Sequence, residues 1–469
     1  MARNKNISLD RLTEAKSSPV ALRRMVFWLA LPAVGEQVLN NIVGLTDQYL
    51  VGNLEPAVAA RLGYDQATAL SAVGLGNIIV WIATTFFMTI AIGATAIIAR
   101  RIGEGEDHRA HHALRQALLI SFVVGSISMV VTFTFAESIL AFLGAEAQVT
   151  VAGAQYLRIL SLSFIPSAFM FAGNAALRGA GDTRTPLYLM TVVNLLNIFV
   201  SWLLVNGRLG FVGLGVEGSA IGSAVGRTLA GLLLVVLFMA GRMRLKISRD
   251  WRADWEVMKN ILRIGLPSAG ERLIFQAALI VMARLITELG SAAYAAHSLT
   301  ITIGSTSFLP SIGFGIAGTT LVGQYLGAKD PKLAERAGWE AWRQGILIVT
   351  AIGLIIAAWP ATIISWFTSD LDVIAYASET LRIQGVGQFF LGTSFILVGC
   401  LQGAGDTTWP LWMRIFTAWG VRIPLILFVL WFTDWELTGI WGAMFCDFVM
   451  QGALSIWRFW GGKWKLIKV

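Results

Sequence analysis

Four carboxylates lie inside long apolar stretches of the sequence, at Glu36, Asp47, Glu271 and Asp447. Placing an Asp side chain at the centre of a membrane helix costs about 2.5–3.5 kcal/mol on insertion scales, so acids in such segments are candidates for function. A carboxyl group in a partly dry cavity can bind and release a proton near neutral pH. It can also attract a cation, and the two then compete for one negative charge.

Glu36 and Glu271 stand four residues after Pro32 and Pro267. A proline frees backbone carbonyls inside a helix, and a polar side chain near it can line a cavity. One interpretation is a vestibule on the cytoplasmic side that gathers cations. The other is local pairing of each acid with Arg227, Arg272 or another buried arginine.

Asp447 lies in an apolar segment, and Arg422 precedes it in the sequence. It either supplies a charge to the second half of the chain or pairs with Arg422. Cys400 and Cys446 also lie in apolar runs, and no His/Cys pattern predicts a metal site. No paired catalytic set or phosphate-binding loop is visible, so neither an intramembrane enzyme nor ATP drive is predicted.

The elements that hold these acids are expected to be membrane helices. Hydrophobic residues make up 56% of the 469 residues, charged residues 14%, and the mean hydropathy is +0.68. Runs of 20 or more apolar residues predict helices rather than barrel strands. Twelve transmembrane helices are expected at about 25–51, 67–103, 110–136, 148–180, 185–206, 215–241, 258–288, 294–327, 342–366, 373–404, 410–432 and 438–460.

Positive charge gathers in alternate connecting segments. Lys and Arg are concentrated in 1–24, 100–115, 242–263, 324–343 and 458–468, whereas the other loops hold mainly acids. The positive-inside rule therefore predicts a multi-pass protein of the inner (plasma) membrane with both termini in the cytoplasm. The net charge of +8 is spread over many loops and forms no single stripe, so no nucleic-acid partner is expected. The macromolecular surroundings of the protein are expected to be membrane lipids.

The chain contains an internal repeat. Leu177–Met190 and Leu401–Arg414 are identical at eight of fourteen positions, at an offset of 401 − 177 = 224, and each contains Gly-Ala-Gly-Asp-Thr. Such a repeat predicts an all-α fold of two six-helix lobes, related by a pseudo-two-fold axis along the membrane normal. The expected divisions are a cytoplasmic segment 1–24, an N-lobe 25–243, a connector 244–257, a C-lobe 258–460 and a cytoplasmic tail 461–469. The Gly-Asp-Thr turns are interpreted as tight joints that cap the next helix.

These motifs resemble the MATE (multidrug and toxic compound extrusion) family of prokaryotic transporters. The resemblance rests on Asp47-Gln-Tyr-Leu-Val-Gly52, on both Leu-x-Gly-x-Gly-Asp-Thr turns and on the glycine-rich segment 313–328. It implies a secondary active exporter and no enzyme. Its substrates would be small organic cations or amphipathic drugs, exchanged for H+ or Na+ by a monomer without other cofactors.

The resemblance also implies a site for the coupling ion. Asp47 matches an ion-coupling Asp, Asn174 and Asn197 match two Asn of the DinF-like branch, and Ser201 stands where that branch has a second Asp. Ser223 matches a helix-six Thr.

In the second half, Gln276 and Leu391 occupy the places of two acids of the NorM branch. The chain is therefore expected to lie nearer the DinF-like branch and to favour protons over sodium. Glu36, Glu271, Gln276 and Asp447 are candidates for the substrate pathway. A lipid-linked oligosaccharide flippase of the same superfamily, an exporter of an endogenous metabolite and a plain channel remain alternatives.

Overall fold

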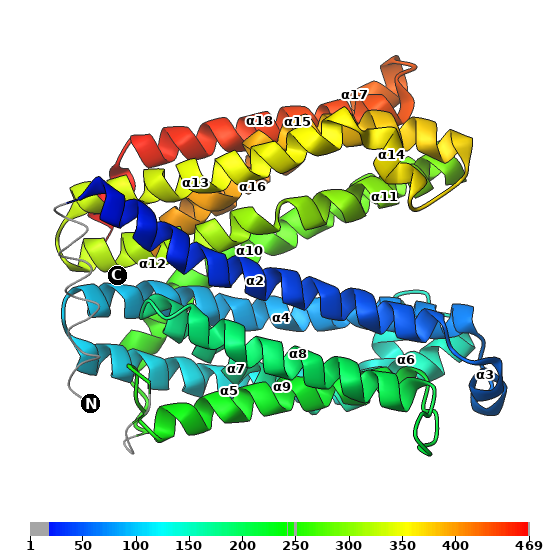
Figure 1. The fold of residues 1–469 in the computed structure, drawn as a ribbon, viewed down its shortest axis with the longest axis horizontal. Helices are drawn as coiled ribbons and strands as arrows, with labels where there is room; N and C mark the ends of the chain where they lie inside the picture. The colour runs from blue at the N-terminus through cyan, green and yellow to red at the C-terminus, as the bar shows by residue number, and fades with distance from the viewer. Residues whose placement is uncertain (1–17, 242, 248–250, 468–469) are drawn as a thin grey trace. The chain divides into compact units, whose positions relative to one another are not determined.

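The computed structural model describes residues 18–241, 243–247 and 251–467, and all regular secondary structure in these ranges is helical (Figure 1). The first half of the chain forms α2 (Pro19–Gly52), α3 (Pro56–Leu62), α4 (Gln66–Gly103), α5 (Asp107–Phe142), α6 (Ala147–Ser161), α7 (Phe164–Gly179), α8 (Arg184–Val205) and α9 (Val216–Met239). The second half forms α10 (Trp255–Ile286), α11 (Ser291–Ser307), α12 (Leu309–Gly327), α13 (Pro331–Ala358), α14 (Pro360–Ser365), α15 (Leu371–Gly403), α16 (Thr408–Ile415), α17 (Ile423–Phe432) and α18 (Glu436–Trp460).

The twelve apolar runs each correspond to one helix or to consecutive helices. Within the described residues, ten helices are long and apolar enough to cross a membrane, and the bent pair α6–α7 makes up to eleven. That pair changes direction by 54°. The remaining run is α10, a 32-residue helix that carries Glu271 and Arg272 near its middle. The all-α membrane architecture is therefore confirmed.

Two compact units make up the chain. One comprises residues 35–98 and 106–262, and the other comprises the described residues up to Val34 together with 99–105 and 263–467. The starts of α2 and α10 and the end of α4 each belong to the unit built mainly from the other half. The expected division into lobes 25–243 and 258–460 stays a prediction. We call the units the first unit (35–98, 106–262) and the second unit.

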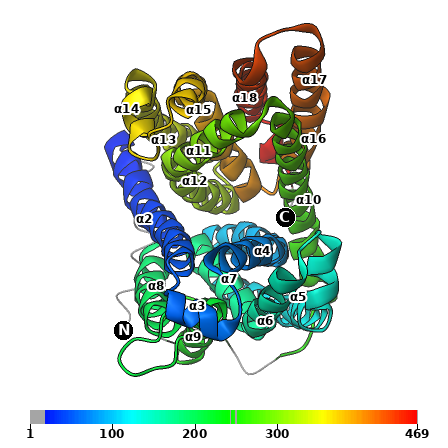
Figure 2. The same ribbon diagram turned by 90° about the vertical axis from the view of Figure 1, so that its right-hand side faces the viewer.

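In the first unit, α5 to α9 are packed in a connected bundle: α8 lies against α9, α5 lies against α6 and α7, and both α6 and α7 lie against α9. Figure 2 looks along these helices and shows α5, α6, α7 and α9 grouped together. Buried aliphatic and aromatic side chains from 50–87 and 136–168 fill the interior at one end of the unit. This bundle supplies the rigid frame for the polar groups described below.

In the second unit, α15 is the central helix and lies against α11, α12, α13 and α18. Leu22, Val26 and Ala30 of α2 belong to the same buried cluster as residues of α12, α13 and α15. The start of α2 is therefore part of this core. The long run 410–432 is interrupted by a π-helical stretch, Phe416–Arg422, between α16 and α17.

The internal repeat produces a reciprocal contact within the second unit. A Cβ atom on Gly103 would lie 1.9 Å from the carbonyl oxygen of Gln324, and a Cβ atom on Gly327 would lie 2.0 Å from that of Arg100. Gly103 and Gly327 are related by the repeat offset, as are Arg100 and Gln324. Contacts of i with j and of j with i are the signature of a two-fold relation. Only glycine permits this approach of α4 to α12.

The two Gly-Asp-Thr turns form tight joints, as expected. Gly181 and Gly405 have φ values of 85° and 86°, which favour glycine. Asp182 accepts hydrogen bonds from the backbone N–H groups of Arg184 and Thr185 at 3.1 and 3.0 Å, and so caps the start of α8. Asp406 in the second turn differs, because it accepts a hydrogen bond from Arg458 Nε at 2.8 Å and thereby ties the turn to α18.

Candidate functional site

The polar centre of the first unit is a chain of hydrogen bonds that ends on Asp47. The Ser223 hydroxyl donates to Asp47 Oδ2 at 2.9 Å, and Asn197 Nδ2 donates to Ser223 Oγ at 3.0 Å. The Ser201 hydroxyl donates to Asn197 Oδ1 at 3.4 Å. All four side chains are buried, and Asp47 Oδ1 has no hydrogen-bond partner. The structure thus brings together four of the five residues predicted for ion coupling, from α2, α8 and α9.

Glycine on α9 permits this arrangement. A Cβ atom on Gly222 would lie 2.2 Å from Ser201 Oγ and 2.9 Å from the Ser201 backbone nitrogen. Ser223 follows Gly222 directly, and Asn197 and Ser201 lie one turn apart on α8. The close approach of the two helices therefore sets the hydrogen-bond distance between Asn197 and Ser223.

Two further groups act electrostatically on this centre, and sequence reasoning did not place either of them there. Arg227 lies one turn after Ser223 on α9 and is close enough to interact with the Asp47 charge, as is Tyr156 of α6. Arg227 Nη1 has no hydrogen-bond partner, whereas the Tyr156 hydroxyl donates to Asn77 Oδ1 at 3.1 Å. The i, i+4 spacing of Ser223 and Arg227 was the available signal. Asp47 and Arg227 thus form an oppositely charged pair with no hydrogen bond between them in the described part of the molecule.

Asn174 lies on α7 and is buried, but no hydrogen bond joins it to this chain of groups in the described part of the molecule. Its Oδ1 atom has no hydrogen-bond partner at all. A buried amide oxygen without a partner loses about 1–3 kcal/mol of solvation, so this position is one where water or a ligand atom would be stabilised.

Glu36 is paired with an arginine. Arg178 Nη1 donates to both carboxylate oxygens, at 3.0 and 3.2 Å, and the Glu36 side chain is buried. The partner is neither Arg227 nor Arg272. Arg178 belongs to the Leu-Arg-Gly turn at the end of α7, so this ion pair connects α2 to the turn that precedes α8.

The second unit contains a more extensive network of buried charges. Arg414 Nη2 donates to Glu271 Oε1 at 3.2 Å, and Arg414 Nη1 also donates to Gln451. Gln451 Nε2 in turn donates to Asp447 Oδ2 at 2.8 Å. The ring of Phe275 lies under the Arg414 guanidinium, 4.7 Å from its carbon atom. Glu271 therefore has an arginine partner too, from α16.

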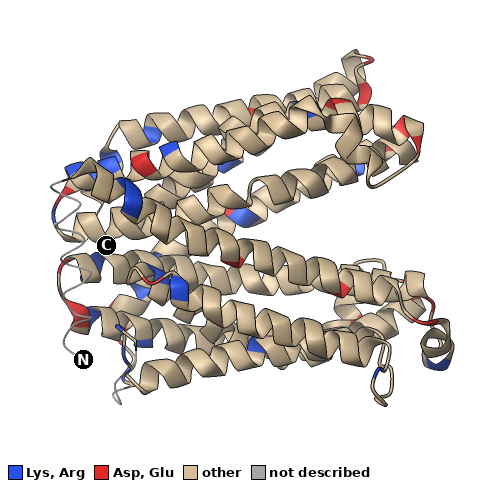
Figure 3. Cartoon of the chain, in the orientation of Figure 1, with Lys and Arg blue, Asp and Glu red and all other residues tan. Residues whose placement is uncertain are grey.

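Asp447 pairs with Arg422, one of the two roles considered for it. Arg422 Nε donates to Asp447 Oδ2 at 2.8 Å, the Arg422 Nη2 group contacts the same oxygen, and both side chains are fully buried. Gln276, the remaining candidate for the substrate pathway, is half-buried on α10. Figure 3 shows how sparse charged residues are along the middle of the helices, which makes these pairs conspicuous.

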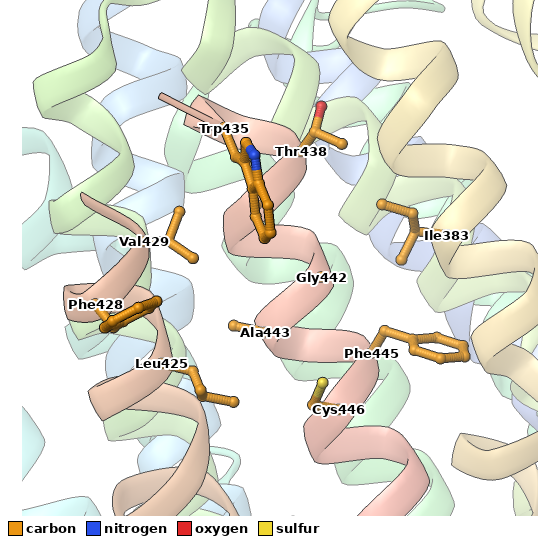
Figure 4. Close-up of a pocket in the computed structure, with 11 residues that line it drawn as sticks. Ile383, Leu425, Phe428, Val429, Trp435, Thr438, Gly442, Ala443, Phe445 and Cys446 are labelled. Atoms are coloured by element: carbon orange, nitrogen blue, oxygen red, sulfur yellow. The ribbon is translucent and has the colours of Figure 1, made fainter. Parts of the chain in front are cut away.

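An apolar groove of about 510 Å³ lies between α15, α17 and α18 of the second unit (Figure 4). Leu425, Phe428, Phe445 and Cys446 are among its lining residues, and Thr438 is its main polar group. The Thr438 hydroxyl is hydrogen-bonded to Glu379, so it does not offer a free donor. The groove contains none of the predicted site residues.

Comparison with known proteins decides the family. The MatE family model matches residues 32–203 and 267–428, one segment in each half of the chain. The chain belongs to the MATE family of membrane transporters. It is 31% identical over 445 residues to the "Probable multidrug resistance protein NorM" of Thermotoga maritima, which covers 95% of the chain and 93% of the relative. It is 26% identical over 464 residues to the "Probable multidrug resistance protein YoeA" of Bacillus subtilis, covering 97% and 96%.

Solved structures of MATE proteins share the fold. The structure described as an outward-facing conformation of a multidrug resistance MATE family transporter of the MOP superfamily has a TM-score of 0.86 at 21% identity, covering 94% of this chain and 97% of that one. A MOP superfamily transporter from Pyrococcus furiosus, whose binding pocket is described as having reverse polarity, gives the same values. Several relatives carry the name NorM, so the expected closeness to the DinF-like branch is not confirmed and stays a prediction.

Proposed function

We propose that this MATE transporter exports cationic or amphipathic organic compounds in exchange for protons, with Asp47 as the group that binds the proton. Both termini lie in the cytoplasm in this proposal, as the distribution of Lys and Arg predicts. The names of the relatives, which describe probable multidrug resistance proteins, support the choice of substrate class.

One observation carries the choice of Asp47. Four buried acids were predicted as site residues, and Glu36, Glu271 and Asp447 are each paired with an arginine. Asp47 is the fourth, and no arginine in the described part of the chain is hydrogen-bonded to it. An acid with a fixed cationic partner keeps its charge, because the partner stabilises the ionised form. Asp47 instead has one oxygen held by Ser223 and one oxygen open to a proton.

The geometry suggests how protonation acts on the helices. Ionised Asp47 accepts the Ser223 hydrogen bond and attracts Arg227, both on α9. A proton on Oδ1 removes the negative charge, so the attraction between α2 and α9 weakens and the charge available to a cationic substrate disappears. Proton and substrate therefore compete for one carboxylate, which is the requirement for antiport.

Everted membrane vesicles provide the test, with ethidium as the transported cation and proton and sodium gradients imposed one at a time. Wild-type protein should accumulate ethidium under a proton gradient alone. Asp47→Asn should abolish this uptake while leaving folding intact, because Asn keeps the Ser223 hydrogen bond but cannot take up a proton. Asp434→Asn, which alters an exposed acid, is the matched control and should transport at the wild-type rate.

Three outcomes would contradict the proposal. Full proton-driven uptake by Asp47→Asn would remove Asp47 from coupling. Uptake that follows only a sodium gradient would assign the coupling ion to sodium. Flux of ethidium that never exceeds its own gradient would indicate a channel.

A further inference from the structure

A hollow of about 670 Å³ lies where the first turns of α2 meet the beginning of α13, both in the second unit. Leu22 and Arg23 line it from α2, and Arg336, Trp339 and Arg343 line it from α13. This is the end of the helices that the positive-inside rule assigns to the cytoplasmic surface of the membrane. None of the predicted coupling or substrate residues is part of it.

The charge of the hollow is positive. Three arginines line it, Arg23, Arg336 and Arg343, against one acid, Glu340. Glu340 is held by Arg343 at 2.8 Å and lies 3.7 Å from Arg23. Arg336 is exposed and forms no ion pair within the described residues. Three guanidinium groups and one carboxylate therefore line the hollow, and Arg336 remains available to an external anion.

The wall of the hollow combines apolar surface with indole rings. Trp339 and Trp342 meet edge to face with ring centroids 5.6 Å apart, and Trp339 also packs on Phe459 at 5.1 Å. Trp342 Nε1 donates to Thr393 Oγ1 at 3.0 Å, which fixes that ring. Tryptophan is enriched at the depth of lipid headgroups. The wall thus offers indole and other apolar surface beside the arginines, a combination suited to a lipid headgroup and the first part of an acyl chain.

We propose that this hollow binds one anionic phospholipid of the inner leaflet. Its phosphate would lie at Arg336, with Arg23 and Arg343 beside it, and its acyl chain would run along Leu22 and Trp339. Arginine suits the task because its planar guanidinium donates two parallel hydrogen bonds to a phosphate. The bound lipid joins the start of α2 to α13. This site is independent of the ion that drives transport.

The test measures lipid bound to the purified full-length protein by native mass spectrometry, with phosphatidylglycerol and phosphatidylcholine offered in equal amounts. Phosphatidylglycerol should be retained in preference. Arg336→Gln should lower its apparent affinity about fivefold and Arg336→Glu roughly 25-fold, from the usual contribution of one and two charges at a membrane surface. Arg336 makes no ion pair with any other residue that the structure describes, so both variants should fold, and thermal unfolding in detergent without lipid checks this.

Lys259→Glu is the matched control, since it reverses an exposed positive charge on α10 in a residue that does not line the hollow. It should retain phosphatidylglycerol as the wild type does. Equal retention of the two lipids by the wild type, or undiminished phosphatidylglycerol binding by Arg336→Glu, would overturn the proposal. Equal losses in Arg336→Glu and Lys259→Glu would also overturn it, because they would show attraction by overall charge rather than a site.

Discussion

Asp47 and Asp447 are the same residue type in similar apolar helices, yet their surroundings give them different tasks. Asp47 accepts one hydrogen bond, from a hydroxyl group. Asp447 accepts bonds from Arg422 and from Gln451 on a single carboxylate oxygen. A buried acid with an arginine on it is part of the scaffold, because its charge cannot be removed without leaving the arginine unpaired.

Asp447→Asn should therefore destabilise the protein strongly. The change leaves a fully buried Arg422 without its counter-charge, and breaking a buried pair in this way costs about 3–5 kcal/mol. Thermal unfolding in detergent measures the loss, with Asp47→Asn as the comparison that should unfold close to wild type. The double variant Arg422→Met/Asp447→Leu should recover much of the stability, since an apolar pair replaces the ion pair. An Asp447→Asn protein as stable as wild type would show that Arg422 has another partner.

The sequence predicted individual residues where the informative pattern lay within a short stretch of the chain. Asp47 was found because an acid in an apolar run is rare, whereas Ser223 was named from the family resemblance, as the match of a helix-six Thr, and it donates a hydrogen bond to Asp47. Arg422 was considered as the partner of Asp447, but Arg178 and Arg414 were not found as the partners of Glu36 and Glu271. Arg178 is 142 residues from Glu36, and no local pattern links two charges at that separation.

At the scale of elements, the connector between the two halves is fastened to α5. His112 Nε2 is hydrogen-bonded to Asp254 Oδ2 at 2.9 Å, and the Asp254 backbone N–H donates to Gln116 Oε1 at 3.0 Å. Asp254 Oδ1 also accepts from the backbone N–H groups of Glu256 and Val257, which caps the start of α10. The hydrogen bond from His112, followed by the bond from the Val257 backbone, lowers the pKa of Asp254 below its ordinary value.

Asp254→Ala should loosen the first turn of α10. Loss of such a cap costs about 1 kcal/mol, which corresponds to roughly fivefold faster hydrogen exchange at the amides of Glu256 and Val257. A lowered pKa means that the stabilisation is complete above the ordinary Asp value of about 3.9 and is lost as the pH falls through the lower folded-state value. The ratio of exchange rates between variant and wild type should therefore approach one in acid.

Glu256→Gln, a neighbouring exposed position, is the control and should not alter exchange by this mechanism. A ratio that stays constant from neutral pH to well below 3.9 would show that the Asp254 charge does not contribute to the cap.

The helices themselves were largely predictable, because length and hydropathy alone define a membrane span. Interruptions within the spans were not. The bend between α6 and α7 and the π-helical stretch Phe416–Arg422 both occur inside continuous apolar runs. Pro424 lies two residues after the end of that stretch and lacks a backbone donor, which marks a distortion but does not reveal its form.

At the scale of the whole molecule, the repeat is visible as the reciprocal contact of Gly103 and Gly327 with backbone carbonyls of α12 and α4. Such a crossing leaves no room for a Cβ atom on either side. The sequence predicted the duplication from the 224-residue offset, but it did not indicate that the two matching glycines meet.

Gly103→Ala and Gly327→Ala should each destabilise the protein by about 1–3 kcal/mol, because the added methyl group pushes the two backbones apart. Thermal unfolding in detergent measures the effect. Gly74→Ala is the matched control on the same helix α4, where a Cβ atom meets nothing within 4 Å and alanine favours the helix. The double variant should lose less than the sum of the single losses, since one displacement relieves both clashes. Strict additivity would contradict a shared crossing.

The two units exchange the starts of two helices. The first turns of α2 belong to the unit built mainly from the second half, and the first turns of α10, to Leu262, belong to the unit built mainly from the first half. Leu22, Val26 and Ala30 fill one core, and Gly93 leaves room for the backbone of Ile261 in the other. Neither half is complete without a piece of its counterpart. A cut of the polypeptide between residues 243 and 244 would therefore remove part of both units instead of separating them.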